Sequence, residues 1–181
     1  MTRKNALLAG LILALLPNAA MPEVVDSAAN GFTVKITLNI QGSPGDVYLR
    51  LVRDIGDWWN PAHTFSGNAH NMSIDEKPMG CFCEKLPNQG GVRHMEVLFV
   101  APGKNIVMGG AIGPMQSLAA AGTMNIEFSK VDAGTKLDVT YAAVGYFPKG
   151  MNLFAAPSDN VLTEQFTRLK NYIEHGNPAA K

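Results

Sequence analysis

The sequence lacks an excess of charge of either sign. Its 181 residues include 15 Lys or Arg and 15 Asp or Glu, so the formal net charge is zero. Proteins that bind nucleic-acid phosphates usually carry a strongly basic surface. Because this sequence has no excess of basic residues, nucleic acid is not expected as a partner. The longest apolar run, Ala6 to Leu16, has eleven residues, whereas a bilayer span needs roughly 20. No transmembrane span is expected.

The sequence also lacks the short motifs of several enzyme classes. It has no G-x-S-x-G elbow, no P-loop and no G-x-G-x-x-G at a strand-to-helix turn. Gly109 to Pro114 is glycine-rich but lies between predicted strands, so we interpret it as a bend or loop. Donors suited to zinc occur without tight ligand spacing, and neither a metal site nor a cofactor is expected; these donors are His63, His70, Cys81, Cys83, Glu84 and His94.

Cysteine is scarce, and both cysteines lie close together. Cys81 and Cys83 are two residues apart in a predicted strand, which places their Cα atoms about 6.6 Å apart on one face. That separation is near the upper limit for a disulfide. Two small buried thiols are therefore favoured, with a labile redox pair or half of a metal site as alternatives.

The N-terminus has the composition of a secretory signal peptide. A short basic segment is followed by the apolar run and then by a proline and small residues, over residues 1–20. We predict cleavage after Ala20, with Ala29 as a second candidate site. An uncleaved membrane anchor is disfavoured because the apolar run is short. The mature protein is expected to be exported, to the periplasm or beyond, with residues 21–31 as a loose leader.

Two early segments have clear periodicity. Phe32 to Ile40 alternates apolar and polar residues, which is typical of a half-buried strand. Ser43 and Pro44 then form a helix start, with Ser43 as N-cap, and Gly56 is expected to end that helix. Further strands are predicted around residues 71–76, 80–86, 92–100, 105–112, 122–131 and 136–146, with hairpin turns at Pro102-Gly103 and Asp132 to Thr135.

A long amphipathic helix closes the chain. Apolar residues recur at helical spacing from Asn160 to His175, and Gly176 follows as a stop signal. The order of elements predicts an α+β fold, in which a curved antiparallel sheet of six to seven strands wraps around this helix. Residues 32–176 are expected to form one domain, and 177–181 a tail.

This order resembles the START-like, or SRPBCC, superfamily with its helix-grip fold. Within it, the polyketide cyclase/dehydrase and lipid-transport-like bacterial proteins are the most similar. The segments that carry the resemblance are Gln41-Gly-Ser-Pro44, Asp57 to Gly67, Gly80 with Glu84, Val92 to Met95, Pro102 to Lys104, Gly109 to Pro114, Gly134-Thr135, Tyr141 and the terminal helix. The resemblance implies a deep apolar cavity between sheet and helix. It does not fix the function, because one fold hosts many activities.

Aromatic residues and methionines are the candidate cavity lining. The two tryptophans, Trp58 and Trp59, fall in a segment expected to lie over the cavity mouth. The alternative is that one tryptophan fills the core and the other packs the loop. The candidate ligand-binding residues are Trp58, Trp59, His63, Phe65, Met95, Met108, Tyr141 and Tyr146. Met115, Met124 and Met151 can also furnish an adaptable lining, although ordinary core packing explains any single methionine as well.

Glu84 and His94 are the pair of polar residues that most specifically indicates a chemical function. If the hairpin bends symmetrically about Gln89, the two residues face each other across the strands. A carboxylate beside an imidazole can orient a general base, so both residues are candidate catalytic groups. A solvent-facing ion pair is the structural alternative.

Three functions are compatible with these features. The first is an exported monomer that binds a small hydrophobic molecule in the cavity. The second is an enzyme of cyclase, dehydratase or hydrolase type, in which His94, oriented by Glu84, removes a proton. The third is a protein-interaction module, which has a filled interior and an exposed apolar patch.

Overall fold

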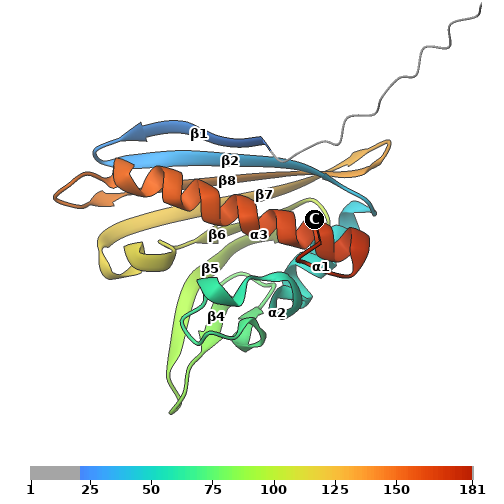
Figure 1. Ribbon diagram of the computed structural model, residues 1–181, viewed down its shortest axis with the longest axis horizontal. Helices are drawn as coiled ribbons and strands as arrows, with labels where there is room; N and C mark the ends of the chain where they lie inside the picture. Colours follow the sequence, from blue (N-terminus) through green and yellow to red (C-terminus); the bar gives the residue numbers. More distant parts are fainter. Residues whose placement is uncertain (1–20, 181) are drawn as a thin grey trace, which may run out of the picture.

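A computed structural model of the protein describes residues 21–180 and has the predicted α+β architecture (Figure 1). One open antiparallel sheet of eight strands has the order β1-β2-β8-β7-β6-β5-β4-β3. The helix α3 (Ala155–His175) packs against one face of it. The strands are β1 (Met21–Ala28), β2 (Gly31–Ile40), β3 (Met72–Ile74), β4 (Cys81–Lys85), β5 (Gly91–Ala101), β6 (Asn105–Gly109), β7 (Ala119–Val131) and β8 (Gly134–Tyr146). The predicted signal peptide, residues 1–20, lies outside the described residues.

The strand β2 confirms the alternation read from the sequence. Its apolar side chains from Phe32 to Ile40 are buried at every second position, and the residues between them are more exposed. It pairs with β8, whose inward residues Leu137, Val139 and Tyr141 alternate in the same way. Burial of one face against α3 therefore fixes the register of this pair.

The strand β1 corrects the expectation of a loose leader. Met21–Ala28 pairs with β2 along its whole length, with a bulge between Val24 and Asp26. Its side chains from Glu23 onward are exposed, so they carry no hydrophobic alternation. The strand exists because its backbone groups pair with the edge of β2. Residues 21–28 therefore belong to the sheet and are not a loose leader to it.

The helix α1 (Pro44–Arg53) begins as predicted. The Ser43 hydroxyl accepts a hydrogen bond from the Asp46 backbone N–H at 3.2 Å, and Pro44 occupies the first turn. Gly56 does not end this helix, because α1 stops at Arg53 and Gly56 lies within the short helix α2 (Ile55–Trp58). Two 3-10 turns, η1 (Pro61–His63) and η2 (Ala69–Asn71), then lead to β3.

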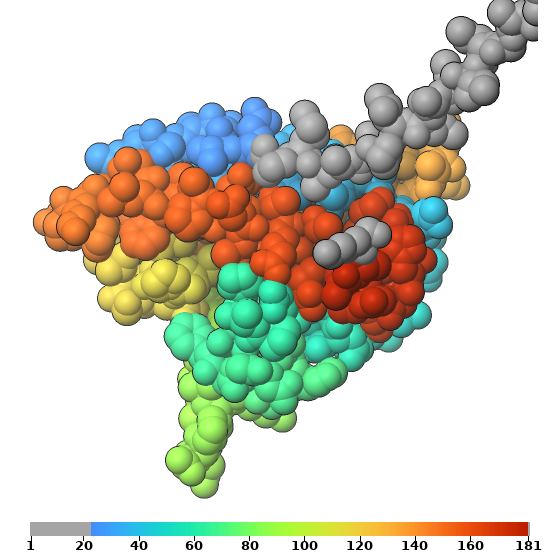
Figure 2. All heavy atoms as spheres, viewed as in Figure 1, coloured from blue at the N-terminus to red at the C-terminus, as the bar shows by residue number. Residues whose placement is uncertain are grey.

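The strands β4 to β8 are consecutive antiparallel neighbours, and both predicted hairpin turns are present. The turn at Pro102-Gly103 joins β5 to β6, and the turn at Asp132 to Thr135 joins β7 to β8. The strand β6 ends at Gly109, and the glycine-rich segment after it leads into the 3-10 turn η3 (Gly113–Ser117). The hairpin of β4 and β5 extends away from the body of the molecule (Figure 2).

The helix α3 starts five residues earlier than the periodicity predicted. It follows the 3-10 turn η4 (Met151–Phe154), and Pro157 lies in its first turn, where a backbone N–H has no intrahelical partner. Gly176 ends it with a φ of 67°. Leu162, Phe166 and Leu169 are fully buried. Among residues 21–180, no helix is long and apolar enough to cross a membrane.

Candidate functional site

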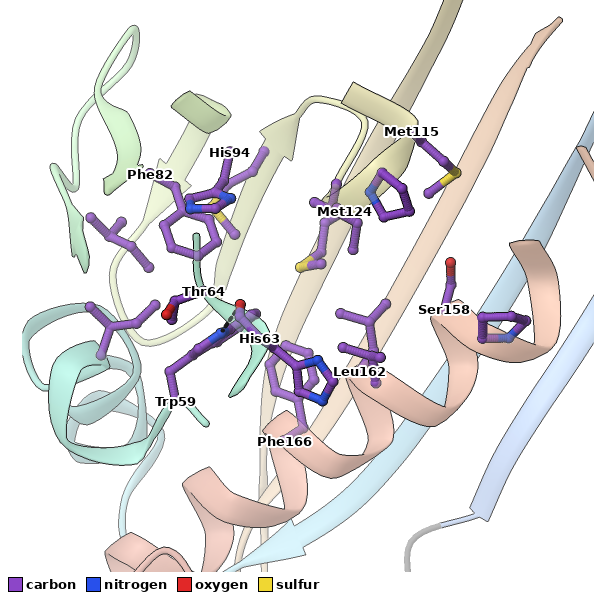
Figure 3. Close-up of a pocket in the computed structure, with 18 of the residues that line it drawn as sticks. Trp59, His63, Thr64, Phe82, His94, Met115, Met124, Ser158, Leu162 and Phe166 are labelled. Atoms are coloured by element: carbon purple, nitrogen blue, oxygen red, sulfur yellow. Dashed lines mark hydrogen bonds between the residues drawn. The ribbon is translucent and has the colours of Figure 1, made fainter. Parts of the chain in front are cut away.

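A cavity of about 420 Å³ lies between the sheet, α3 and two loops that contain residues 59–65 and 112–115 (Figure 3). Apolar side chains make most of its wall. From the sheet come Ile74, Phe82, Met108, Met124 and Ile126, and from α3 come Pro157, Val161, Leu162 and Phe166. The other lining residues are Leu51, Ile55, Trp59, His63, Thr64, Phe65, His94, Ile112, Gly113, Pro114, Met115, Phe154 and Ser158.

Local periodicity explains the helix wall. Ser158, Leu162 and Phe166 follow one another four residues apart along α3, and Pro157 and Val161, also four apart, form a second row beside them. The sequence marked this stripe as buried but did not separate residues that touch the sheet from residues that border open space. That distinction depends on how far α3 stands from β6 and β7.

Four of the candidate ligand-binding residues line the cavity. These are Trp59, His63, Phe65 and Met108. Met115 and Met124, which the sequence offered as adaptable lining, are there as well. An unbranched thioether adjusts to ligands of different shape, so this wall is suited to an irregular apolar ligand.

The other four candidates lie elsewhere. Trp58 is 1% exposed, packs beside Phe166 and donates its indole N–H to the Arg50 carbonyl at 3.2 Å. Met95 is buried in the core. The Tyr141 hydroxyl accepts the Ile112 N–H at 3.2 Å, and burial raises its pKa to about 12.

Tyr146 is 71% exposed, because it points to the opposite face of β8 from Tyr141. The two tryptophans thus differ: Trp58 fills the core, as the alternative weighed from the sequence has it for one of them, whereas Trp59 lines the cavity.

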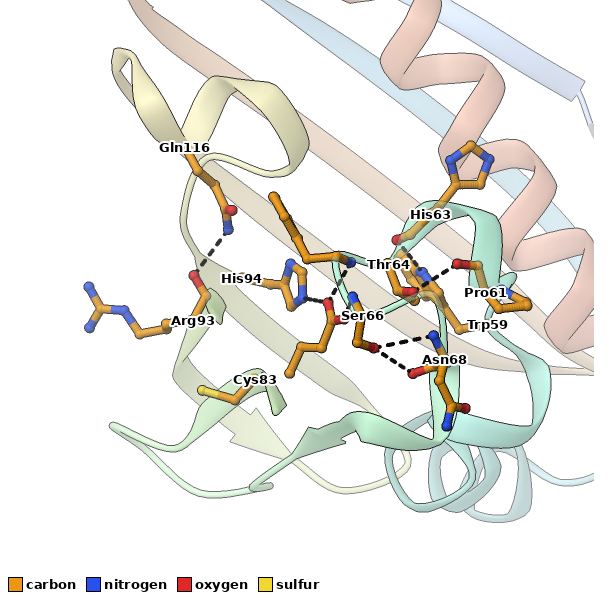
Figure 4. Close-up of polar contacts among 12 residues, drawn as sticks. Trp59, Pro61, His63, Thr64, Ser66, Asn68, Cys83, Arg93, His94 and Gln116 are labelled. Carbon is orange, nitrogen blue, oxygen red and sulfur yellow. Dashed lines mark hydrogen bonds and ion pairs between the residues drawn. The ribbon is translucent and has the colours of Figure 1, made fainter. Parts of the chain in front are cut away.

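Glu84 and His94 are in contact, as predicted. His94 Nε2 lies 3.0 Å from Glu84 Oε2, and both side chains are buried. The backbone N–H of Phe65 donates to Glu84 Oε2 at 3.0 Å, and the N–H of Ser66 donates to Oε1. Figure 4 shows these contacts converging on one carboxylate. A solvent-facing ion pair is therefore not what the structure contains.

The predicted register behind this contact is wrong. Glu84 pairs with Val92 rather than His94, and Phe82 pairs with Met95. His94 lies two residues beyond Val92 and therefore on the same face, diagonally across from Glu84, and a bulge in β5 leaves it without a partner on β4. The turn holds Asn88 and Gln89 at φ values of 55° and 63°. The contact is therefore diagonal and does not arise from direct opposition.

The surroundings of the pair set its charge state. Burial raises the pKa of Glu84, but the hydrogen bonds from Ser66 and Phe65 and the contact with His94 outweigh burial, so the pKa lies below its ordinary value. Burial lowers the pKa of His94 more than the Glu84 carboxylate raises it. The pair is thus a carboxylate beside a neutral imidazole at neutral pH.

The loop over the cavity is anchored to α3 as well as to Glu84. His63 Nε2 lies 3.0 Å from Glu164 Oε2, and the Asn60 side chain donates to the other oxygen of the same carboxylate. The Asn60 N–H donates to Gln165 Oε1 at 2.7 Å. Sequence reasoning missed Glu164 and Gln165, because polar residues on an amphipathic helix carry no signal that distinguishes an anchor from a solvated face.

Cys81 and Cys83 form a disulfide, with their Cα atoms 5.3 Å apart. The preference for two free thiols is therefore wrong, since pleating of β4 brings the Cα atoms closer than a fully extended strand would. Within residues 21–180, no three His, Cys, Asp or Glu side chains gather as metal ligands would.

Comparison with known proteins supports the fold alone. Neither a family model nor a curated protein matches the sequence. An uncharacterized protein from Rhizobium leguminosarum matches with a TM-score of 0.59 and 16% identity over 82% of this chain and 97% of that chain. CalU16 from Micromonospora echinospora matches with a TM-score of 0.57 and 12% identity over 90% and 88%.

A third match is the Aha1 dimer from Colwellia psychrerythraea, with a TM-score of 0.54 and 17% identity over 80% of this chain and 97% of that chain. At these identities the likeness extends to the architecture, a helix-grip-like antiparallel sheet with a C-terminal helix. It does not extend to what those proteins do.

Proposed function

We propose that the protein binds one small hydrophobic molecule in the cavity between its sheet and α3. The observation that carries this proposal is the cavity itself, about 420 Å³ in volume and walled mostly by apolar side chains. Small-molecule sites have volumes of about 300–1,000 Å³ and the same composition, a largely apolar wall with a few polar groups. An interaction module without a ligand would have a filled interior.

Burial of apolar ligand surface supplies the affinity. Each 100 Å² of apolar surface removed from water contributes about 2.5 kcal/mol. Association and ordering of the ligand consume part of that gain. The anchored loop lowers this cost, because residues 60 to 66 are already held by Glu164 and Glu84 before a ligand arrives.

The proposal includes membership of the START-like superfamily and export. The arrangement of the sheet and C-terminal helix supports the first. The basic and apolar composition of residues 1–20 supports the second. Cleavage after Ala20 would leave β1 whole, whereas cleavage after Ala29 would remove it from the sheet.

Native mass spectrometry tests the binding proposal. We would purify the protein from its own host, measure its intact mass, and analyse the small molecules released on denaturation. A discrete hydrophobic compound in stoichiometric amount is the expected result. The variant Val161→Trp places an indole in the cavity and should lose the compound, while Leu153→Trp, at a position 52% exposed, should retain it.

An apoprotein that stays empty after incubation with hydrophobic extracts of the host would contradict the proposal. Equal retention by Val161→Trp and Leu153→Trp would show that any bound compound lies outside this cavity. Circular dichroism of both variants would establish that each is folded.

A second candidate function rests on the buried Glu84 and His94 pair. A neutral imidazole oriented by a carboxylate at the wall of a cavity is suited to accept a proton. The protein would then convert its ligand, as cyclases and dehydratases do. Chemical change of the released compound by the wild type, lost in a folded His94→Gln variant, would distinguish an enzyme from a carrier.

A further inference from the structure

The cavity wall holds no charged lysine, arginine, aspartate or glutamate side chain among the described residues. Its polar side chains are Trp59, His63, Thr64, His94 and Ser158. Three of these are engaged with the protein. The Trp59 indole donates to the His63 carbonyl at 3.1 Å, the Thr64 hydroxyl donates to the Pro61 carbonyl at 2.8 Å, and His63 contacts Glu164.

The contacts of Glu84 determine which nitrogen of His94 carries the proton. An ionised carboxylate only accepts hydrogen bonds, and both Glu84 oxygens already accept backbone N–H groups. His94 Nε2 must therefore be the donor toward Glu84 Oε2. In a neutral imidazole, the remaining nitrogen, Nδ1, then has a free lone pair.

Nδ1 of His94 has no hydrogen-bond partner among residues 21–180. His94 lines both this cavity and a smaller pocket of about 260 Å³, and its ring centroid lies 5.0 Å from that of Phe82 and 5.9 Å from that of Phe65. Figure 3 shows His94 and Phe82 together at one end of the cavity, with Ser158 toward the other. An acceptor held beside aromatic rings at one end of an apolar space is suited to a hydrogen-bond donor from the ligand.

We propose that the ligand is an uncharged apolar molecule with a hydroxyl group, a phenol in the first instance, and that its O–H is donated to His94 Nδ1. The proposal rests on the proposed function and specifies its ligand class. The aromatic surroundings favour a flat ring next to the hydroxyl, because aromatic pairs gain from tilted and edge-to-face contact.

The same geometry excludes charged ligand ends at this position. A carboxylate has no proton to give to Nδ1 and would lie beside the buried Glu84 carboxylate, with no cationic side chain in the wall. An ammonium would lose its hydration, and the Glu84 oxygens that could compensate are already occupied. Fatty-acid anions bound with the carboxylate inward are therefore disfavoured.

Matched naphthalene probes test the inference. At about 30 Å³ per water, the cavity volume corresponds to about 14 waters, so a two-ring probe is of suitable size. Equilibrium dialysis would compare 2-naphthol, 2-methoxynaphthalene and 2-naphthoate. We expect 2-naphthol to bind at least tenfold more tightly than its methyl ether, because the ether leaves Nδ1 unpaired, and we expect 2-naphthoate not to bind measurably.

The variant His94→Phe should reduce the preference for 2-naphthol over the ether to less than twofold while the ether still binds. His70→Phe, at an exposed histidine, is the matched control and should keep the tenfold preference. Because loss of His94 leaves Glu84 without a partner, the variant can fail to fold. Nitrogen-15 NMR of the wild type then decides, since Nδ1 should be unprotonated and should shift with 2-naphthol but not with the ether.

Equal affinity for 2-naphthol and its ether would overturn the hydroxyl inference and leave the proposed function standing. Tighter binding of 2-naphthoate, or a proton on Nδ1 in the free protein, would overturn it too. Failure of all three probes would overturn the inference, whereas the proposed function would fail only if native mass spectrometry also found the cavity empty.

Discussion

His94 Nε2 lies 3.0 Å from Glu84 Oε2, in a contact that joins two strands and the loop over the cavity. Glu84 belongs to β4 and His94 to β5, and the same carboxylate accepts the backbone N–H groups of Phe65 and Ser66. One buried side chain thereby fixes the orientation of His94 and the position of the loop. Removal of the Glu84 carboxylate should therefore affect both the orientation of His94 and the position of the loop.

The variant Glu84→Ala should be strongly destabilised. It would leave two backbone N–H groups and an imidazole N–H without their acceptor in a buried site. We expect the free energy of unfolding to fall by about 3 kcal/mol, measured by urea denaturation. Limited proteolysis should also cut the loop of residues 60 to 66 faster.

Glu96→Ala is the control for that variant. Glu96 forms an exposed ion pair with Arg93 at 2.9 Å, and such pairs contribute at most about 1 kcal/mol. Similar losses for Glu84→Ala and Glu96→Ala would mean that the buried carboxylate does not hold the site together.

Acid should destabilise the protein through His94. Because burial lowers the pKa of His94 in the folded state, the unfolded chain takes up the proton first, and the free energy of unfolding falls as the pH drops below about 6.5. The pKa of Glu84 is also lowered, so its contribution is lost at still lower pH, with the same sign.

The variant His94→Gln retains a donor for Glu84 but does not titrate. Its stability should therefore fall less than that of the wild type between pH 6.5 and 5.5, as measured by urea denaturation at several pH values. A variant at the exposed His70, His70→Gln, provides the control. Parallel curves for the wild type and His94→Gln would show that His94 does not cause the acid sensitivity.

The two tryptophans should report differently on binding. Trp59 lines the cavity, whereas Trp58 is enclosed in the core. An apolar probe without its own fluorescence, such as 1-decanol, should change the emission of the wild type and of Trp58→Phe but not that of Trp59→Phe. Trp58→Phe should cost about 2 kcal/mol of stability by leaving a cavity in the core.

Trp59→Phe should cost about 1 kcal/mol, because it loses the hydrogen bond to the His63 carbonyl. A probe-induced change that persisted in Trp59→Phe and vanished in Trp58→Phe would place the ligand away from the described cavity.

The strand β1 should protect the edge of the sheet. A protein that starts at Asn30 would expose the backbone groups of β2 that β1 now pairs with. Such edges promote association between chains, so the shorter protein should form oligomers in size-exclusion chromatography as its concentration rises. A protein that starts at Met21 is the control, and identical elution and thermal midpoints would show that β1 is dispensable.

Local sequence pattern was sufficient to predict most elements of the fold. The alternation of Phe32 to Ile40 and the stripe before Gly176 repeat with the period of their element, because one face of each is buried. The helix start at Ser43 and the hairpin turns carry the residue types that caps and turns favour. Tertiary contacts were needed for β1, whose exposed side chains have no such period and whose strand depends on a neighbouring backbone.

The candidate site could not be predicted in full from the sequence pattern. The sequence by itself determined that Glu84 and His94 lie on neighbouring strands near each other, whereas the cavity between sheet and helix was an implication of the family resemblance, with aromatic residues and methionines as candidates for its lining. Only the tertiary structure decided that Trp59 rather than Trp58 lines the cavity, and that Glu84 pairs with Val92 and meets His94 diagonally. Periodicity indicates which side chains are buried. Whether a buried side chain packs against other atoms or borders a cavity depends on the distance between elements that are far apart in the chain.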